Sequence, residues 1–281
     1  MAVRRRPLRT KVLMHLALAP FLFFALFPFY HMTLTSLKTD RELYDRTAVP
    51  LLIRQGPTLE HYQKLIWETA FLTWTKNSLM VTAIATGVSV VIGTIAAYAL
   101  ARLKFVGVGW LGTGIFVTYL VPTSLLFLPL AQVVHWIGLA DSKWSLVVTY
   151  PTFLVPFCTW LLIGYFRTVP KEIEECAMVD GATRIQALWR IVLPIAVPGL
   201  VCAALFAFTL SWNEFIYALT FISSSDQATA SVGVTQELIR GDIYFWGSLM
   251  AGAVLGSVPI VILYVFFLDY YVSGLTAGAV K

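Results

Sequence analysis

A short stretch between two long apolar segments of the chain is rich in ionisable side chains. Its charged residues are Glu172, Glu174, Glu175, Asp180, Arg184 and Arg190. Because ionisable groups are costly in lipid, this stretch is expected in water, where its charges are available to a partner. Gly181 interrupts the stretch, and glycine permits a turn that a side chain would resist. The pattern predicts two short helices joined at Gly181, an elbow built to contact another protein.

A second ionisable group lies inside an apolar run, within the sequence Ser211-Trp212-Asn213-Glu214. A charge at mid-membrane costs about 2.5–3.5 kcal/mol on insertion scales. Glu214 is therefore expected to face the interior of a helix bundle or an aqueous cavity, with Asn213 nearby. Two interpretations remain open. Glu214 lines or gates a path through the membrane, or its carboxylate makes a structural hydrogen bond that locks two helices.

Patterns that would give the chain catalytic or metal chemistry of its own are missing from the sequence. There is no Gly-x-x-x-x-Gly-Lys-Ser/Thr string for ATP, no His-x-x-x-His or Cys-x-x-Cys pair, and no Gly-x-Ser-x-Gly elbow. Cys158, Cys176 and Cys202 lie in or beside apolar segments without ligand spacing. We therefore expect no enzymatic activity, no metal and no cofactor bound by this chain.

The composition predicts a membrane protein. The 281 residues are 58% hydrophobic and 12% charged, whereas soluble domains are about a quarter charged. A span needs about 20 mostly apolar residues. Six candidate spans lie at about 12–34, 78–100, 110–134, 144–166, 195–222 and 248–270. The predicted fold is all-α, with six transmembrane helices and a cytoplasmic two-helix elbow.

The distribution of Lys and Arg predicts that both termini lie in the cytoplasm. That orientation places 12 basic residues inside and 8 outside. The net charge of +5 thus reflects membrane orientation, and no nucleic acid is expected as a partner. The predicted organisation is a cytoplasmic segment 1–11, a transmembrane domain 12–272 that contains the loop 168–194, and a cytoplasmic tail 273–281.

Small residues and prolines in the spans predict how the helices pack. Span two carries Gly87, Ser89, Gly93, Ala96 and Ala97, and roughly four-residue spacing of small side chains allows close helix approach. Other spans carry prolines, which bend helices. These are Pro20, Pro28, Pro122, Pro129, Pro151 and Pro156. The bends shape a translocation path, or they reflect only the frequency of proline in membrane helices.

The charged elbow also resembles a known motif. Glu175-Cys176-Ala177 is followed after three residues by Gly181, and after nine more by Ile191-Val192-Leu193-Pro194. This spacing resembles the "EAA" loop of ABC-importer membrane subunits, with Cys176 where that family usually has Ala. The resemblance implies that the loop docks into a cleft on the ATP-hydrolysing subunit. The coupling residues are then Glu175, Ala177, Asp180, Gly181, Ile191, Leu193 and Pro194. Pro194 is expected to stop the second helix before span five.

Most of the remaining chain is similar to one subgroup of that family. Asn77-Ser78-Leu79, Ala99-Leu100-Ala101-Arg102 and the final residues 274–281 look like the carbohydrate uptake class one permeases related to the smaller membrane subunit of the maltose importer. The resemblance implies a sugar-importing permease of the cell membrane, in a heterodimer with a second permease. Its other partners would be an extracytoplasmic solute-binding protein and two ATPase subunits, which hold ATP and Mg.

The same resemblance implies roles for three further segments. The Trp-Asn-Glu stretch is common in sugar-importing permeases, so Trp212, Asn213 and Glu214 would line the substrate path. The tail would contact the ATPases, through Gly274, Leu275, Thr276 and Gly278. The outer loop at about 223–247 resembles the loop that probes the binding protein's sugar cleft.

Other functions stay open at the level of sequence. A similar permease could carry a polyol, a glycerophosphate, a phosphate or an amino acid. A secondary transporter would usually show internal repeats and several intramembrane ionisable sites, whereas one strong intramembrane acid is present. A membrane enzyme fits least, because the spans offer few acids, bases or nucleophiles.

Overall fold

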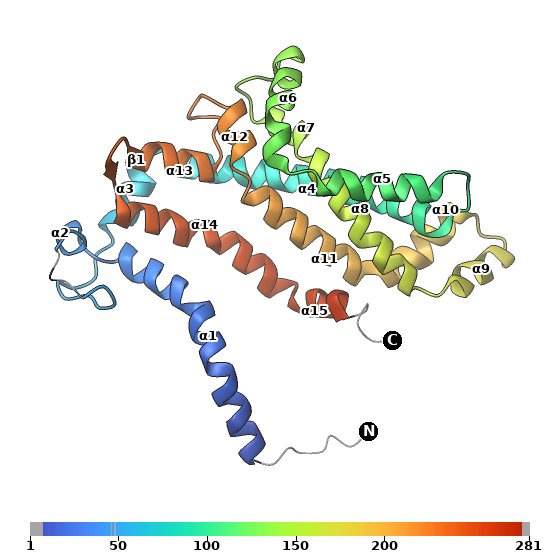
Figure 1. Ribbon diagram of the computed structural model, residues 1–281, viewed down its shortest axis with the longest axis horizontal. Coiled ribbons are helices and arrows are strands. Elements are labelled where there is room, and N and C mark those ends of the chain that lie inside the picture. Colours follow the sequence, from blue (N-terminus) through green and yellow to red (C-terminus); the bar gives the residue numbers. More distant parts are fainter. Residues whose placement is uncertain (1–7, 46, 48, 277–281) are drawn as a thin grey trace. The chain divides into compact units, whose positions relative to one another are not determined.

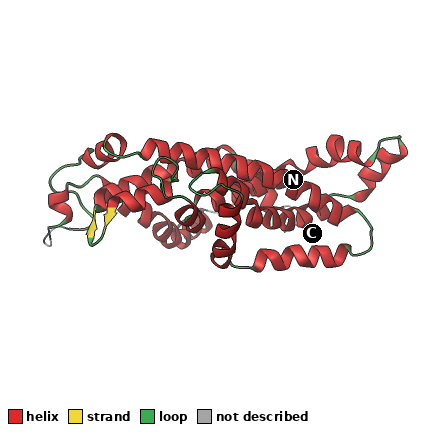
Figure 2. Cartoon of the chain, turned by 90° about the horizontal axis from the view of Figure 1, so that it is seen from above, coloured by secondary structure: helices red, strands yellow, loops and turns green. Residues whose placement is uncertain are grey.

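The computed structural model describes residues 8–45, 47 and 49–276, and these are mostly helical (Figure 1). Among the described residues the only strands are β1 (Ile239–Arg240) and β2 (Ile243–Tyr244), a short antiparallel pair drawn in yellow in Figure 2. Ile239 pairs with Tyr244, and Arg240 with Ile243. The predicted all-α class is confirmed.

The chain forms two compact units, which are described separately. Unit 1 contains the residues up to Thr69 together with Val234–Ser257, and unit 2 contains Ala70–Gly233 and the residues from Val258 onward. The helices of unit 1 are α1 (Leu8–Ser36), α2 (Asp40–Leu43) and α3 (Glu60–Trp67). Helices α13 (Ala230–Leu238) and α14 (Trp246–Phe266) contribute to both units.

The remaining helices belong to unit 2. They are α4 (Phe71–Arg102), α5 (Val108–Leu120), α6 (Thr123–Trp136), α7 (Trp144–Thr149), α8 (Pro151–Thr168), α9 (Lys171–Val179), α10 (Arg184–Ala187), a π-helical turn (Leu188–Val192), α11 (Leu193–Trp212), α12 (Ile216–Phe221) and α15 (Leu268–Thr276). Within unit 2, α9 and α10 lie at one end (Figure 1).

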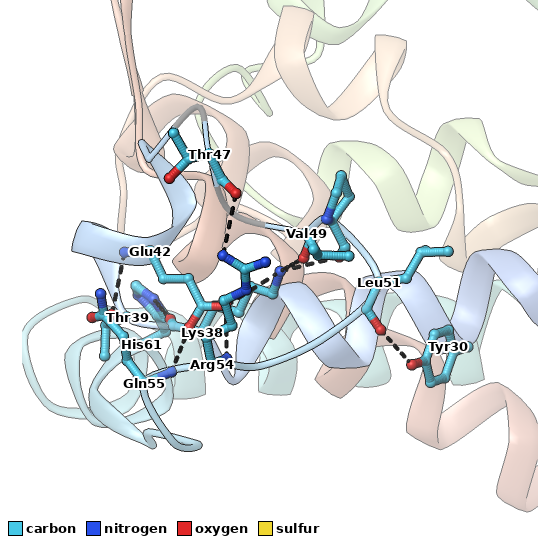
Figure 3. A network of polar contacts seen from close by, with 11 residues as sticks. Tyr30, Lys38, Thr39, Glu42, Thr47, Val49, Leu51, Arg54, Gln55 and His61 are labelled. Atoms are coloured by element: carbon cyan, nitrogen blue, oxygen red, sulfur yellow. Dashed lines mark hydrogen bonds and ion pairs between the residues drawn. The ribbon is translucent and has the colours of Figure 1, made fainter.

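A buried ion pair organises the loop between α2 and α3 in unit 1 (Figure 3). Lys38 Nζ lies 3.6 Å from Glu42 and donates to the carbonyls of Val49 and Pro50 at 2.9 and 3.1 Å. The Glu42 carboxylate accepts the backbone amides of Arg54 and Gln55. Desolvation raises the pKa of Glu42, but these amides and Lys38 more than offset it, so its net pKa lies below the ordinary value.

Helices α4 and α8 form the central pair of unit 2. Ser89, Gly93 and Ala97 of α4 are buried at four-residue spacing. A Cβ added at Gly93 would lie 2.7 Å from the Cβ of Cys158 on α8. Small residues therefore bring the two backbones together, which confirms the predicted packing role of span two. Gly87, which belonged to the predicted set, is exposed instead.

Five described helices are long and apolar enough to cross a membrane, and a sixth span is possible if a bent pair counts as one. That pair is α5 and α6, which meet at 95° where the third span was predicted. Val121, at the bend, is extended with ψ 122°, because the following Pro122 disfavours helical geometry in the residue before it. The third span is thus a broken helix.

Candidate functional site

The charged elbow contains the predicted turn at Gly181. Helix α9 ends at Val179, and Gly181 has φ +93°. The Gly181 amide donates to Met178 O at 3.1 Å, and the Ala182 amide donates to Ala177 O at 3.0 Å. This pair of bonds is the Schellman motif, which ends a helix with a left-handed residue, usually glycine. The chain therefore needs Gly181 for its backbone conformation.

The second half of the elbow begins at a capping box. Thr183 Oγ1 accepts the Gln186 amide at 3.3 Å, and the Thr183 amide donates to Gln186 Oε1 at 2.8 Å. From Arg184 the chain then stays helical as far as Trp212, through the π-helical turn. The prediction that Pro194 stops this helix is wrong. Pro194 follows the π-helical turn, which already interrupts the regular α-helical hydrogen bonds, so its missing amide does not end the helix.

The predicted coupling residues differ in their exposure. Glu175, Asp180, Gly181 and Pro194 are exposed, Ala177 is buried, and Ile191 and Leu193 are half-buried. The elbow also exposes apolar side chains that the sequence analysis did not single out. They are Ile173, Val179, Ile185 and Trp189, with Val179 87% and Trp189 65% exposed. Large apolar residues within a charged loop were the available signal, since such exposure is typical of interaction sites.

Behind the exposed surface, one acidic residue of α9 is buried. Glu174 is 4% exposed. Its carboxylate accepts a hydrogen bond from the hydroxyl of Tyr98 and lies 3.3 Å from Nε of Arg102, both on α4. Arg102 also donates to the carbonyl of Val169 at 2.7 Å, at the end of α8. A polar network thus joins α4, the α8–α9 junction and α9.

An apolar cluster supports the elbow beside this network. Tyr98 packs edge-on against Phe166 of α8, with ring centroids 6.2 Å apart. Leu188 and Val192 from the π-helical turn bury into the same cluster, together with Ala196 of α11. Both halves of the elbow are therefore attached to the helices of unit 2, one through polar contacts and one through apolar contacts.

The predicted path residues lie at a break in the helix. Helix α11 ends at Trp212 and α12 begins at Ile216. The Glu214 carboxylate accepts the amides of Tyr217 and Ala218 at 2.8 and 3.2 Å, and the hydroxyl of Tyr150 at 2.9 Å. Glu214 therefore caps α12, whose first amides have no partner within the helix. The predicted fifth span, 195–222, is interrupted at this point.

The other two predicted path residues have different surroundings. Trp212 is 8% exposed and stacks on Phe208, with ring centroids 5.8 Å apart and an interplanar angle of 12°. Asn213 is exposed, and its side-chain amide donates to Thr209 O at 2.9 Å. Only Asn213 presents its polar side chain at the surface of unit 2, while Trp212 and Glu214 hold the break in shape.

The predicted tail contacts begin inside a packed helix. Gly274 lies in α15, where an added Cβ would come 2.7 Å from the carbonyl of Pro198 on α11. Leu275 and Thr276 complete α15, and Gly278 lies outside the described residues. At Gly274 the chain is therefore still packed against α11.

A second carboxylate binds backbone amides in the loop after α12. Asp141 accepts the amides of Ser223 and Ser224 at 2.8 and 2.7 Å, and also the Ser224 hydroxyl. Hydrogen bonds from the Ser224 side chain and from both amides lower the pKa of Asp141. Asp141 thereby holds the start of the predicted outer loop. Further along, that loop contains α13 and the β1–β2 hairpin.

One group of potential metal ligands occurs in the part of the chain that the structure describes. Oxygen or nitrogen atoms of Asp40, Glu60 and His61 lie within 4.8 Å of one another. However, Nε2 of His61 is 2.8 Å from the carbonyl of Lys38. That nitrogen donates its proton to the carbonyl and has no lone pair for a metal.

The arrangement of helices and elbow matches a known family. Residues 89–276 match the family model described as "Binding-protein-dependent transport system inner membrane component". The chain belongs to this family. The matched range begins within α4 and ends with α15, so it includes the elbow and the broken fifth span. The resemblance seen in the EAA spacing is confirmed.

Individual relatives of this permease agree with the family match. An inner membrane ABC transporter permease protein, YcjP of Escherichia coli, is 36% identical over the full length of both chains. The trehalose/maltose transport system permease protein MalG of Thermococcus litoralis is 34% identical over 91% of each chain. Among solved structures, a chain of a bacterial ABC transporter that imports alginate has a TM-score of 0.76. The two sequences are 19% identical, and the structural match covers 96% of this chain and 99% of that one. The match therefore supports the fold assignment.

Proposed function

We propose that this permease forms half of the translocation path of an ATP-driven importer for a sugar or oligosaccharide. The observation that carries the proposal is the elbow, which exposes acidic and apolar side chains on helices firmly attached to the membrane bundle. Such a surface suits docking to a partner whose conformational change is transmitted to the membrane helices. The trehalose/maltose relative supports a sugar as the substrate.

The partners of the proposed importer are those that the family resemblance implies. Since its sequence has no ATP-binding string, the energy comes from two ATPase subunits that hold ATP and Mg, and this chain is a non-catalytic subunit without a cofactor. A second permease completes the path, and an extracytoplasmic binding protein delivers the solute. The positive-inside bias supports a multi-pass protein of the cell membrane with both termini in the cytoplasm.

Within this scheme the coupling residues are Glu175, Ala177, Asp180, Gly181, Ile191, Leu193 and Pro194. The exposed apolar residues Val179, Ile185 and Trp189 extend the same surface. At the break in span five, Asn213 faces the solute path, while Trp212 and Glu214 position it. The tail, from Gly274 through Gly278, approaches the ATPases beyond the part of α15 that packs on α11.

A native cysteine allows a direct test of docking. Cys176 is exposed on α9, whereas Cys158 and Cys202 are buried. A maleimide should therefore label Cys176 in the isolated permease, and assembly with the ATPase subunits should slow that labelling. Labelling of the denatured complex controls for reagent access. An unchanged labelling rate in a complex that co-purifies intact would contradict docking at the elbow.

The substrate class needs a separate experiment on the complete complex. We would reconstitute both permeases and the ATPases in proteoliposomes and add the cognate binding protein with a library of candidate solutes. A sugar or oligosaccharide should bind the binding protein and stimulate ATP hydrolysis. Stimulation by an amino acid or a glycerophosphate alone would replace the sugar with that alternative. Transport driven by an ion gradient without ATP would favour a secondary transporter.

A further inference from the structure

The side chain of Glu174 is oriented differently from those of the other acidic residues of α9. Glu172 and Glu175 are exposed, as docking groups should be, whereas the Glu174 side chain is 5% exposed. Its partner Arg102 is 3% exposed. A buried charge is tolerated only when it is paired and hydrogen-bonded. The pair therefore has a role inside the protein that is distinct from contact with a partner subunit.

The contacts of this pair come from three separate elements. Tyr98 and Arg102 are four residues apart on α4, so they lie on one face of that helix. Tyr98 donates its hydroxyl proton to Glu174, and Arg102 Nε faces the other carboxylate oxygen at 3.3 Å. Arg102 also holds the Val169 carbonyl at 2.7 Å, one residue before Pro170, which precedes α9. The end of α4 thus holds α9 at Glu174 and the α8–α9 junction at Val169.

Stability alone does not account for such a pair. Replacing a buried ion pair with apolar residues of similar size is often neutral or stabilising, because the desolvation cost disappears. Arg102 Nε and Glu174 Oε2 also make no hydrogen bond, so their attraction is purely ionic. The hydrogen bonds from the Tyr98 hydroxyl to Glu174 and from Arg102 to the Val169 carbonyl are directional and restrict how α9 lies on α4, whereas apolar surfaces allow sliding. The contribution of the network is therefore orientation.

We infer that Tyr98, Arg102 and Glu174 form a positioning lock that makes α9 move as one body with the end of α4. The three side chains, called the elbow lock below, would carry a displacement of the elbow directly into α4, which packs along α8. This inference rests on the proposed coupling function and extends it. It names the residues that join the docking surface to α4, the first helix of unit 2.

The orientation of α9 can be measured on the full chain without any partner. Spin labels on native Cys176 and on an introduced Lys104→Cys report the distance between α9 and the loop that follows α4, since both positions are exposed. The chain with an intact lock should give one narrow distance distribution. The apolar double variant Arg102→Met with Glu174→Leu should give a broad one. Equal widths would overturn the elbow lock, whatever the transport assays show.

The second measurement is the number of solute molecules transported per ATP hydrolysed by the reconstituted complex. The apolar double variant should keep its ATPase subunits and its melting temperature, yet its transport ratio should fall about tenfold. The charge swap Arg102→Glu with Glu174→Arg should recover part of the ratio. Glu68→Gln, an exposed carboxylate outside the elbow, is the matched control and should leave the ratio unchanged.

The outcomes separate this inference from the proposed function. If the complex with wild-type permease shows no binding-protein-stimulated hydrolysis, the importer assignment fails, and the spin-label distances still test the elbow lock. A normal ratio in the apolar double variant would overturn the lock even in a working importer. A lower melting temperature with an unchanged ratio would leave the pair a purely structural contact and would also overturn it.

Discussion

Two carboxylates of unit 2, at the elbow and at the break in span five, are held in different ways. Glu174 faces an arginine and a phenol from a helix more than 70 residues earlier in the chain. Glu214 receives one distant contact, from the hydroxyl of Tyr150, but no cation among the described residues faces it. Its carboxylate otherwise accepts the amides of Tyr217 and Ala218, three and four residues later. Backbone amides fix a local conformation, whereas an ion pair between helices fixes the arrangement of elements. The elbow is thus built to transmit displacement, and the break is built to keep its shape.

The largest expected effect tests whether the elbow transmits displacement. Gly181→Val should reduce binding-protein-stimulated transport by at least an order of magnitude. The left-handed conformation costs an L-residue roughly 1–2 kcal/mol, and a β-branched side chain resists it most. Nothing lies within 4 Å of an added Cβ, so the effect is conformational rather than a clash. Transport and ATPase activity of the reconstituted complex provide the measurement.

The control for this substitution is Gly181→Asn, because asparagine tolerates the left-handed conformation. It should retain most of the stimulated activity. Wild-type stimulation in Gly181→Val would show that the turn is not needed for coupling.

The next effect concerns the docking surface, where exposed rather than buried charge is at stake. Glu175→Lys should weaken co-purification of the ATPase subunits, because it reverses a charge on the exposed side of α9. Since Glu175 is exposed, the melting temperature of the isolated permease should not change. Quantitative co-purification in detergent, at low and high salt, is the measurement. Unchanged stoichiometry together with unchanged transport would mean that Glu175 is only a solvated residue.

Part of this site could be predicted from the sequence, and the reason is local. The turn at Gly181 depends on one backbone conformation that glycine adopts readily, so the sequence pattern alone indicated it. The elbow lock escaped prediction because Glu174 is joined to residues on α4, and spacing along the chain does not show which of three neighbouring glutamates is buried.

The break in span five was missed for a similar reason. Hydropathy marks 195–222 as one apolar run, yet Glu214 satisfies the first amides of α12 and receives Tyr150 from another helix. Conversely, Pro194 looked like a stop signal, but it follows the π-helical turn, and the helix continues through it. Sequence patterns identified the segments, and tertiary contacts decided where each helix continues.

A smaller effect tests Glu214, the carboxylate that backbone amides hold at the break in span five. Glu214→Gln should lower the melting temperature of the permease while leaving the ATPase subunits bound. A glutamine has one acceptor oxygen, so its NH2 group would face the backbone amide of either Tyr217 or Ala218. The loss is about 1–3 kcal/mol, the usual cost of an unsatisfied buried group. Thermal unfolding of the purified permease measures it, with exposed Glu68→Gln as the control.

Uptake by the same Glu214→Gln preparation then decides between the two original interpretations of this residue. Reduced stability with normal specific uptake would reject a path-lining role. Normal stability with altered uptake or solute preference would instead reject the interpretation of Glu214 as a structural cap.

The smallest effect is confined to the loop after α12. Asp141→Ala should speed hydrogen exchange at the amides of Ser223 and Ser224, which lose their acceptor. Asp141→Asn should have a weaker effect, because asparagine keeps one acceptor and suits the φ of 56° found here. Exchange followed by mass spectrometry would show the difference. Equal exchange in all three proteins would mean that Asp141 does not hold the loop.

The lowered pKa of Asp141 gives this clamp a defined pH dependence. Its contribution to stability is complete above the ordinary aspartate pKa of about 3.9 and is lost as the pH falls through the lower folded value. Protection of the Ser223 amide, measured as the intrinsic exchange rate at each pH divided by the observed rate, should therefore stay constant around neutral pH and fall only in strong acid. A fall in this protection between pH 7 and pH 5 would contradict the assignment.

The π-helical turn at Leu188–Val192 determines the direction in which the elbow points. In a plain α-helix, residues four apart drift by about 40° around the axis, because 3.6 residues fill a turn. The π turn, closed by the bond from the Leu193 amide to Leu188 O, is wider and offsets that drift. Leu188 and Val192, at the two ends of this turn, share one core with Ala196. The direction of the elbow thus depends on the number of residues in the π-helical turn. Deleting one residue here would rotate the elbow away from its partner. Substitutions at exposed Trp189 or Arg190 would leave its direction unchanged.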